Sequence, residues 1–389
     1  MKPVPQPFTL PPKHGTLIPW MHVRYRIRKL NGPEPDPANT ERSLTLAEKE
    51  IKQKKKGCFG KCIKWLFLII LGLLLILTVW NFICGLDEKK KLRQAAYGQT
   101  VDVNGKKMTA EIKGGEHDTT IILLPGLGSV SPVLEFRPLA EKLSAEYRVI
   151  TVEPFGYGLS DPAGSDRTLN AVVNELHSCV QSLGCTDYYL MGHSLSGIYM
   201  LAWANQYPDE VEGFIGIDNS VPKQEDCNPL PVSTITVNQI AYGVSRFMNF
   251  TGIMRLLSVS DHRAILTADA SYPYSQEDID LCRLLTLHRS VNKDVRNELK
   301  CLEKNMAASR QMTLPESVPA LIFVASSNCD FMPEWEQLHK DIVTEKEHSE
   351  VIKLQGEHYL HFDNLQNITD AVFAWIPADA QTAPAAAEQ

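Results

Sequence analysis

The sequence predicts an α/β protein: a mostly parallel, doubly wound sheet with an inserted helical cap, preceded by one transmembrane helix. Two observations carry this prediction. Short apolar runs alternate with helix-like segments between residues 120 and 217, a rhythm typical of parallel strands joined by crossover helices on both faces. Far upstream, Trp65 to Trp80 forms an apolar run without a single charge.

The sheet is expected to open with a hairpin. Residues 99–103 and 107–112 show strand patterns joined around Asn104-Gly105, a dipeptide that favours tight hairpin turns. Strands and helices then alternate: strands near 120 and over 147–152, 187–192 and 213–217, with helices over 133–144, 168–183 and 195–207. Because ligands bind at the carboxyl ends of such strands, that edge of the sheet is the expected site.

The alternation stops between Asn219 and Glu316. Helical spacing of Ile240, Val244, Phe247 and Met248, and helix-forming sequence over 276–312, predict a helical cap at about 219–316. A cap over the carboxyl edge would shape a pocket and exclude water. Strand patterns return over 319–325 and 350–354, so the globular domain is expected to span 99–376, and the low-complexity residues 377–389 to form a disordered tail.

The apolar run is expected to be a retained membrane anchor over residues 65–84, followed by a linker over 85–98. It holds roughly 20 apolar residues, about 30 Å of helix, which is enough to cross a bilayer. Sixty-four residues precede the run and no small-residue cleavage site follows it, unlike a signal peptide. A buried core helix is the alternative, but the run is apolar on every face.

Flanking charge predicts how the anchor is oriented. Seven lysines lie between residues 49 and 64, against four basic residues over 89–93 that sit beside Asp87 and Glu88. This bias predicts a cytoplasmic N-terminus and a globular domain outside the membrane. Residues 1–64 form a proline-rich tail of net charge +9, which leaves −16 for the rest of the chain. A basic segment beside a membrane favours contact with anionic lipids, and no nucleic-acid motif is present.

Cysteine and histidine spacing gives no sign of a metal site or cofactor. Six of the nine cysteines fall in the globular domain, where disulfides are permitted but their pairing cannot be read. His358 and His361 share a His-x-x-His spacing, yet no further ligands accompany them, so His361 is interpreted as a packing residue. The oligomeric state is left open by the sequence.

The most specific motif is the apolar run from Tyr188 that turns through Gly192 and Ser194 into a helix. A serine on such a sharp strand-to-helix turn projects its hydroxyl clear of the backbone, so Ser194 is the candidate nucleophile. Gly192 meets the need for small residues around the turn, whereas Ser196 stands where glycine is usual and Gly197 follows one residue late. An ordinary helix N-terminus capped by Ser194 is the alternative.

A second glycine-rich turn lies upstream, where residues 119–128 predict a buried strand running into the loop Pro125-Gly126-Leu127-Gly128. The backbone N–H groups of Leu127 and of Leu195, the residue after the candidate nucleophile, are the expected donors of an oxyanion hole. A plain strand-ending turn would give the same pattern.

A base and an acid complete the expected set. His358 follows the strand over 350–354 and is the candidate general base toward Ser194. Asp330 follows the strand over 319–325 and is the preferred acid, because a loop gives a carboxylate more reach. Asp218, at the end of the strand over 213–217, is the alternative acid. His193 is interpreted as structural.

Taken together, these residues resemble the alpha/beta-hydrolase superfamily, especially its serine esterase and lipase-like branch. The resemblance covers about Val101 to Ile376, and its landmarks are residues 124–128, the Gly156-Tyr157-Gly158-Leu159-Ser160-Asp161 turn, residues 192–197, Asp330 and His358. Pro125, where many members carry histidine, and Ser196 are departures that remove no reacting atom. A serine nucleophile argues against epoxide hydrolases and haloalkane dehalogenases, which use aspartate there.

The resemblance implies a membrane-anchored serine hydrolase that cleaves a carboxylic ester or related acyl substrate through an acyl-enzyme, with no cofactor. Its expected partners are a small-molecule or lipid-like acyl substrate and, through residues 65–84, a membrane. An acyltransferase or thioesterase would use the same three side chains. A non-catalytic binding protein of the same fold is the alternative from a different class.

Overall fold

The computed structural model describes residues 37–228, 233–258, 266 and 272–377. The chain divides into two compact units, one ending at Leu71 and one beginning at Gly72, and each is described by itself. Most of the predicted proline-rich tail, residues 1–36, and the predicted disordered tail from residue 378 lie outside the described residues.

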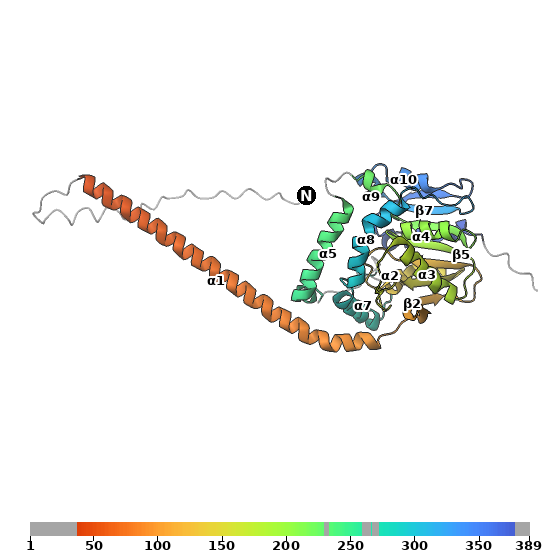
Figure 1. Ribbon diagram of the computed structural model, residues 1–389, viewed down its shortest axis with the longest axis horizontal. Coiled ribbons are helices and arrows are strands. Elements are labelled where there is room, and N and C mark those ends of the chain that lie inside the picture. Colours follow the sequence, from red (N-terminus) through yellow and green to blue (C-terminus); the bar gives the residue numbers. More distant parts are fainter. Residues whose placement is uncertain (1–36, 229–232, 259–265, 267–271, 378–389) are drawn as a thin grey trace, which may run out of the picture. The chain divides into compact units, whose positions relative to one another are not determined.

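Helix α1 (Pro37–Gln94) is continuous over 58 residues and includes the whole apolar run (Figure 1). Proline suits the first position of a helix because its missing N–H would have no partner there. Within α1, the segment Ile63–Gln94 contains an 18-residue stretch with a mean hydropathy of 2.7, and the helix is long and apolar enough to cross a membrane. The expected linker over 85–98 is helical as far as Gln94.

Eight strands form one sheet in the order β1-β2-β4-β3-β5-β6-β7-β8. β1 pairs antiparallel with β2 and β2 with β4, which confirms the opening hairpin, and all remaining pairs are parallel. The strands are β1 (Gln99–Val103), β2 (Lys106–Lys113), β3 (Thr120–Leu124), β4 (Arg148–Glu153), β5 (Tyr188–His193), β6 (Val211–Ile217), β7 (Ala320–Ala325) and β8 (Glu350–Leu354).

Helices cover both faces of the sheet because its parallel strands are apolar on both sides. In β3, Ile122 and Leu124 belong to one core, and Ile121 and Leu123 belong to the core on the opposite face. The first core is closed by α3 (Leu169–Ser182), α4 (Ser196–Gln206) and α10 (Trp335–Ile342), and the second by α2 (Pro132–Leu143), α11 (Leu360–Asp363) and α12 (Leu365–Trp375).

Between β6 and β7 the described chain is helical. The inserted elements are η1 (Gln224–Asp226), α5 (Thr234–Thr251), α6 (Ile253–Leu257), α7 (Gln276–His288) and α8 (Lys293–Ser309), and α9 (Ser326–Phe331) follows β7. α7 begins with a capping box, in which Ser275 and Asp278 each bond the other's backbone N–H.

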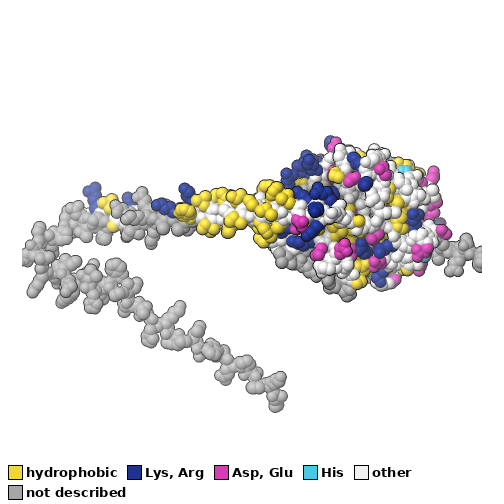
Figure 2. All heavy atoms as spheres, turned by 90° about the horizontal axis from the view of Figure 1, so that it is seen from below, with side chains coloured by type: hydrophobic (Ala, Val, Ile, Leu, Met, Phe, Trp, Pro, Cys, Tyr) yellow, Lys and Arg dark blue, Asp and Glu magenta, His cyan; other side chains and the backbone are white. Residues whose placement is uncertain are grey.

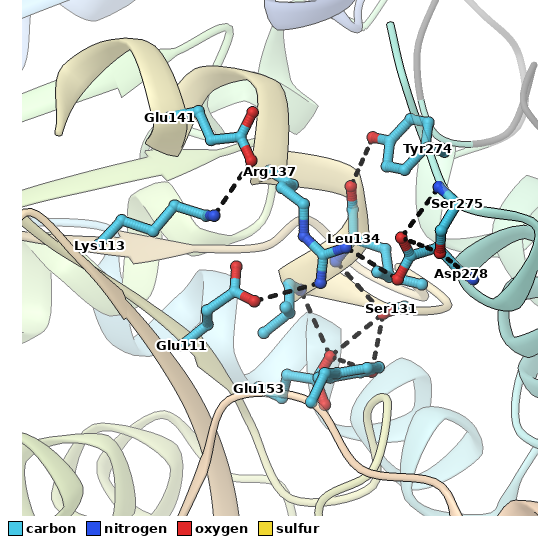
Figure 3. Close-up of polar contacts among 12 residues, drawn as sticks. Glu111, Lys113, Ser131, Leu134, Arg137, Glu141, Glu153, Tyr274, Ser275 and Asp278 are labelled. Carbon is cyan, nitrogen blue, oxygen red and sulfur yellow. Dashed lines mark hydrogen bonds and ion pairs between the residues drawn. The ribbon is translucent and has the colours of Figure 1, made fainter. Parts of the chain in front are cut away.

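The inserted helices are fastened to α2 by polar contacts, which Figure 3 shows. Arg137 of α2 lies 2.8 Å from Asp278 of α7 and 3.1 Å from Glu111 of β2, so one guanidinium joins three elements. The Tyr274 hydroxyl donates to the Leu134 carbonyl at 2.7 Å. These contacts keep α7 close to the sheet edge.

Candidate active site

Ser194 occupies a strained turn between β5 and α4. Its φ angle is +52°, in the left-handed region that residues with a side chain rarely adopt. Space beside the turn is restricted: a Cβ atom on Gly192 would lie 2.7 Å from the Met200 sulfur and 2.9 Å from the Ser196 Cβ. The glycine is therefore required for β5 and α4 to approach each other, as expected for a nucleophile elbow.

The structure gives Ser196, the departure from the usual glycine, a role of its own. Its hydroxyl donates a hydrogen bond to the Pro125 carbonyl, which ties the start of α4 to the loop after β3. The glycine one residue later meets the tightest approach, since a Cβ on Gly197 would lie 2.3 Å from the Ser220 carbonyl oxygen. Ser196 thus fits the turn and helps to fix the neighbouring loop.

His358 bridges the serine and a carboxylate. Its Nε2 atom lies 2.9 Å from the Ser194 hydroxyl oxygen, and its Nδ1 atom lies 2.6 Å from a carboxylate oxygen of Asp218. An ionised carboxylate accepts only, so this contact assigns the proton to Nδ1 and leaves Nε2 free to accept from the serine. The imidazole is thereby oriented as a base toward the hydroxyl.

Asp218 is fully buried and held by several donors. Its carboxylate accepts from the Ala325 N–H at 2.9 Å, the Trp335 indole N–H at 2.8 Å and the Asn328 amide at 2.5 Å. Such bonds fix the carboxylate and offset the cost of burying its charge. Asp218 directly follows β6, which runs beside β5, so the two strand ends carry Ser194 and Asp218 to the same edge.

The expectation that Asp330 is the acid partner of His358 is corrected by this geometry. β7 runs straight into α9, which carries Asp330 to the surface, where its side chain is 81% exposed. Its ion-pair partner is Lys353, at 3.8 Å. The alternative acid, Asp218, takes the place beside the histidine because its strand adjoins that of the serine, whereas β7 lies one strand further away.

The two expected oxyanion donors lie at the same cavity as the serine. Leu127, Leu195, Ser194 and His358 all line a cavity of about 360 Å³. The loop after β3 packs directly on the elbow, since a Cβ on Gly126 would lie 3.1 Å from the Ser194 Cβ. Leu195 also caps the N-terminus of α4, where backbone N–H groups and the helix dipole favour negative charge.

The rest of this cavity is mixed in character. Its apolar lining includes one side chain of α5, two of α8 and several of the segments after β7 and β8: Ile235, Leu302, Met306, Phe331, Met332, Trp335 and Tyr359. Besides Ser194 and His358, its polar lining residues are Ser220, Gln224, Glu225, Asn238 and Asn328. A moderately sized apolar group with a polar end fits such a lining.

A buried network that sequence reasoning missed supports the loop after β3, which carries Leu127. The Tyr157 hydroxyl donates to the Glu298 carboxylate at 2.6 Å and accepts from the Gly128 N–H at 3.2 Å. The Tyr199 hydroxyl donates to the other oxygen of Glu298 at 2.8 Å. Burial raises the pKa of Glu298. The sequence signalled only Tyr157, through its glycine-flanked turn, and nothing marked Glu298 within the helical cap.

Two neighbouring histidines have structural surroundings. The His193 Nε2 lies 3.0 Å from the His358 carbonyl oxygen, and burial, together with His358 and His361, holds its pKa well below the usual range. His361 is buried with its Nε2 3.3 Å from Glu135 and its ring 4.8 Å from that of Phe136. Both rings therefore pack behind the site.

Within the described residues, one group has ligand atoms close enough to share a metal ion: Glu345, Glu347 and His348. It lies before β8, and none of the three lines the cavity of Ser194. Seven cysteines of the described chain are free thiols: Cys84, Cys179, Cys185, Cys227, Cys282, Cys301 and Cys329.

Comparisons with known proteins agree with the fold. The family model of the alpha/beta hydrolase fold matches residues 119–252. The uncharacterised protein YbdG of Bacillus subtilis (strain 168) is 28% identical over 278 residues, covering 69% of this chain and 81% of YbdG. A 2-hydroxy-6-oxononadienedioate/2-hydroxy-6-oxononatrienedioate hydrolase of Paraburkholderia phymatum is 30% identical over 150 residues, 37% of this chain and half of that enzyme. Among solved structures, the epoxide hydrolase CorEH aligns with a TM-score of 0.54 at 16% identity, covering 72% of this chain and 98% of its own.

Proposed function

Because the chain belongs to the alpha/beta-hydrolase superfamily, we propose that it is a serine hydrolase of a carboxylic ester or a related acyl substrate, anchored in a membrane. The observation that carries the proposal is the chain of contacts from Ser194 through His358 to Asp218, at 2.9 and 2.6 Å. A hydroxyl, an imidazole and a buried carboxylate in this order form an activated nucleophile. The matched relatives include hydrolases, which is consistent with this reaction class.

The proposed reaction begins with attack of the Ser194 hydroxyl oxygen on the carbonyl carbon, while His358 Nε2 takes the hydroxyl proton. The resulting oxyanion accepts from the Leu127 and Leu195 N–H groups. His358 then gives its proton to the leaving group, and the acyl-enzyme remains. Water, deprotonated by His358, attacks the acyl carbon; the bond to the serine oxygen breaks, the carboxylic acid leaves, and His358 returns its proton to the Ser194 oxygen. Asp218 holds the ring and stabilises its protonated form throughout.

The proposed anchor is the apolar part of α1. Its composition and length support a membrane span, and the lysine excess before residue 65 favours a cytoplasmic N-terminus with the catalytic domain on the other side. Anchoring would hold the cavity close to amphiphilic acyl substrates, which makes lipid-like esters one substrate class among those that fit.

A panel of p-nitrophenyl esters with increasing acyl chains tests the activity directly. The full chain is expected to hydrolyse at least one chain length, and Ser194→Ala to lower kcat by roughly 10⁴-fold. Ser182→Ala is the matched control, because that hydroxyl is exposed and bonds only the Ser178 carbonyl of its own helix among the contacts described. Equal turnover by Ser194→Ala and Ser182→Ala would refute the proposed nucleophile. Folded protein inactive on every ester would favour a non-catalytic binding protein.

A further inference from the structure

Helix α5 carries an apolar stripe on its outer side. Val237, Ile240, Val244 and Phe247 follow one another at spacings of three and four residues, so they share one face of the helix. Their exposed fractions are 44, 61, 53 and 54%. Three more exposed apolar side chains follow in the next turns: Phe250, Leu256 and Leu257. These seven residues are called the outer face of α5–α6 below.

The opposite side of α5 faces the catalytic cavity. Ile235 and Asn238 line the cavity that holds Ser194, and Asn238, Tyr242 and Ser245 line a neighbouring cavity of about 290 Å³ that also touches Leu127. One side of α5 therefore lines the two cavities, and its other side carries the exposed apolar stripe. Its 18 residues include a single charged one, Arg246.

An exposed apolar stripe of this kind indicates a surface that another molecule covers. A large apolar side chain left in water forgoes the favourable free energy that burial would bring, and contiguous exposed apolar patches mark protein or membrane contacts. Whether a protein or a membrane covers the outer face of α5–α6 is decided by the contacts between these two helices and the C-terminal part of α1.

The turn between α5 and α6 is bonded to α1. The Asn81 side-chain amide donates to the Asn249 carbonyl at 2.9 Å, and its oxygen accepts from the Arg255 Nε–H at 2.9 Å. The backbones come close at the same point, because a Cβ on Gly252 would lie 3.0 Å from the Leu77 carbonyl oxygen. The left-handed φ of +81° at Gly252 adds to the need for glycine there.

Two turns beyond Asn81 along α1, Glu88 receives two partners from the inserted helices. Arg255 bonds both of its oxygens, one of them at 2.6 Å, and the His288 Nε2 lies 2.8 Å away. Arg255 also lies over the Trp80 ring, at 5.7 Å from its centre. The Arg255 side chain is 2% exposed and that of Glu88 12%, so this pair is shielded from solvent.

These contacts lie where the side chains of α1 change from apolar to charged. From Leu73 to Leu86 its large apolar side chains are mostly exposed, and after Asp87 and Glu88 the side chains of Lys89, Lys90, Lys91 and Arg93 are exposed, with Lys91 paired to Asp87 at 2.9 Å. Figure 2 shows Lys and Arg side chains gathered where the hydrophobic surface of the helix reaches the body. An apolar segment followed by cations is typical of the end of a membrane span, with the cations among the lipid headgroups.

We infer that the outer face of α5–α6 rests in the headgroup and upper acyl region of the bilayer in which α1 is anchored. The bonds to Asn81 and Glu88 hold this face at the depth where the span ends, and an apolar helix face at that depth buries itself in lipid. The inference rests on the proposed membrane anchor but not on the reaction. It places the catalytic cavity directly behind a helix that touches lipid.

Photocrosslinking in the full chain tests this contact. The protein is made with p-benzoylphenylalanine in place of Phe247 or of Phe250, reconstituted into phosphatidylcholine vesicles and irradiated. This substitution keeps an aromatic ring at positions whose side chains already point outward, so folding is retained. Both positions are expected to form protein–lipid adducts, detected as a mass increase of one lipid molecule.

Two control positions make the outcome decisive. The positive control carries p-benzoylphenylalanine in place of Phe82, an exposed apolar side chain of α1, and gives the lipid-adduct yield of the proposed membrane span. The negative control carries it in place of Glu116, which is 75% exposed in the loop before β3, and gives the yield of a position in water. Adducts at 247 and 250 approaching the yield at 82 support the inference. Crosslinked chain dimers, or a yield as low as at 116, overturn it. Absence of adducts at 82 as well would instead refute the proposed anchor and the inference together, while ester hydrolysis would remain a separate question.

Discussion

At the scale of single residues, the acid of the proposed triad depends on which strand end lies beside the serine. Asp218 meets His358 at 2.6 Å and is fully buried, whereas Asp330 is 81% exposed. Asp218→Asn is expected to lower kcat by roughly 10⁴-fold, because the amide favours the wrong histidine tautomer. Asp330→Asn, its matched control, is expected to stay within about twofold of the parent chain. Steady-state hydrolysis of a p-nitrophenyl ester measures both, and the opposite ranking would restore Asp330 as the acid.

Glu153 is a second buried carboxyl, at the end of β4 and outside the triad. It accepts from the Tyr97 hydroxyl at 2.7 Å, the Leu159 N–H at 2.7 Å and the Val133 N–H at 3.3 Å, and Figure 3 shows it beside Ser131. Burial raises its pKa to about 7, although these donors act in the other direction. A raised carboxyl pKa means that the folded state holds the proton more tightly than the unfolded state.

This shift predicts a pH-dependent difference in stability. Between the unfolded pKa near 4.5 and the folded value of about 7, the folded chain binds more protons, so the contribution of Glu153 to stability falls as the pH rises. The advantage of the parent chain over Glu153→Gln is expected to be about 2 kcal/mol smaller at pH 8 than at pH 5. Denaturant unfolding of both proteins at the two pH values measures it. A constant or growing difference would show that the carboxyl is ionised in the folded protein across this range.

At the scale of elements, Tyr157 links the loop after β3 to helix α8 through hydrogen bonds. The Tyr157 hydroxyl accepts from the Gly128 N–H, one residue beyond the proposed donor Leu127, and it donates to Glu298 of α8. Tyr199 of α4 donates to the same carboxylate, and no contact described for its hydroxyl reaches the loop. A comparison of variants at Tyr157 and Tyr199 therefore distinguishes an effect on the loop after β3 from a general effect on packing.

Tyr157→Phe is expected to lower kcat by roughly tenfold with little change in KM, because the loop loses the acceptor that fixes Gly128. Tyr199→Phe is the matched variant and is expected to keep kcat within about threefold, while both variants lose similar stability from the unpaired carboxylate. Ester kinetics and Tm measurements distinguish these effects. Equal losses of kcat in the two variants would show that Tyr157 acts only through packing.

At the scale of the whole molecule, the fold was predictable because its strands are buried on both faces. Apolar runs such as residues 120–124 and 188–193 read as strands without alternation, and Asn104-Gly105 marked the hairpin. The acid was not predictable, because two carboxylates follow strands and only the order of the sheet decides which one adjoins Ser194. The role of Glu298 was not predicted from the sequence, because its partner Tyr157 lies 141 positions away in the chain.

The proposed anchor is also a property of the whole molecule. Leu73 and Leu75 are 61 and 65% exposed in the middle of the apolar run, and a lysine near a bilayer centre costs roughly 2.5–3.5 kcal/mol. The double variant Leu73→Lys, Leu75→Lys is expected to be released from membranes by alkaline carbonate, which the parent chain resists. Leu46→Lys, exposed in α1 before the apolar run, is the matched control and should stay membrane-bound. Release of the parent chain by carbonate alone would contradict a membrane-spanning α1.

The most direct test of the triad is reaction of the full chain with a fluorophosphonate, followed by peptide mapping of the adduct. This reagent phosphonylates a serine only where a base activates its hydroxyl, so it reports the contact between Ser194 and His358 without knowledge of the substrate. One adduct is expected, on Ser194; it is lost in Ser194→Ala, and it forms much more slowly in His358→Ala. Folded protein that remains unlabelled, or labels equally well without His358, would contradict the proposed triad.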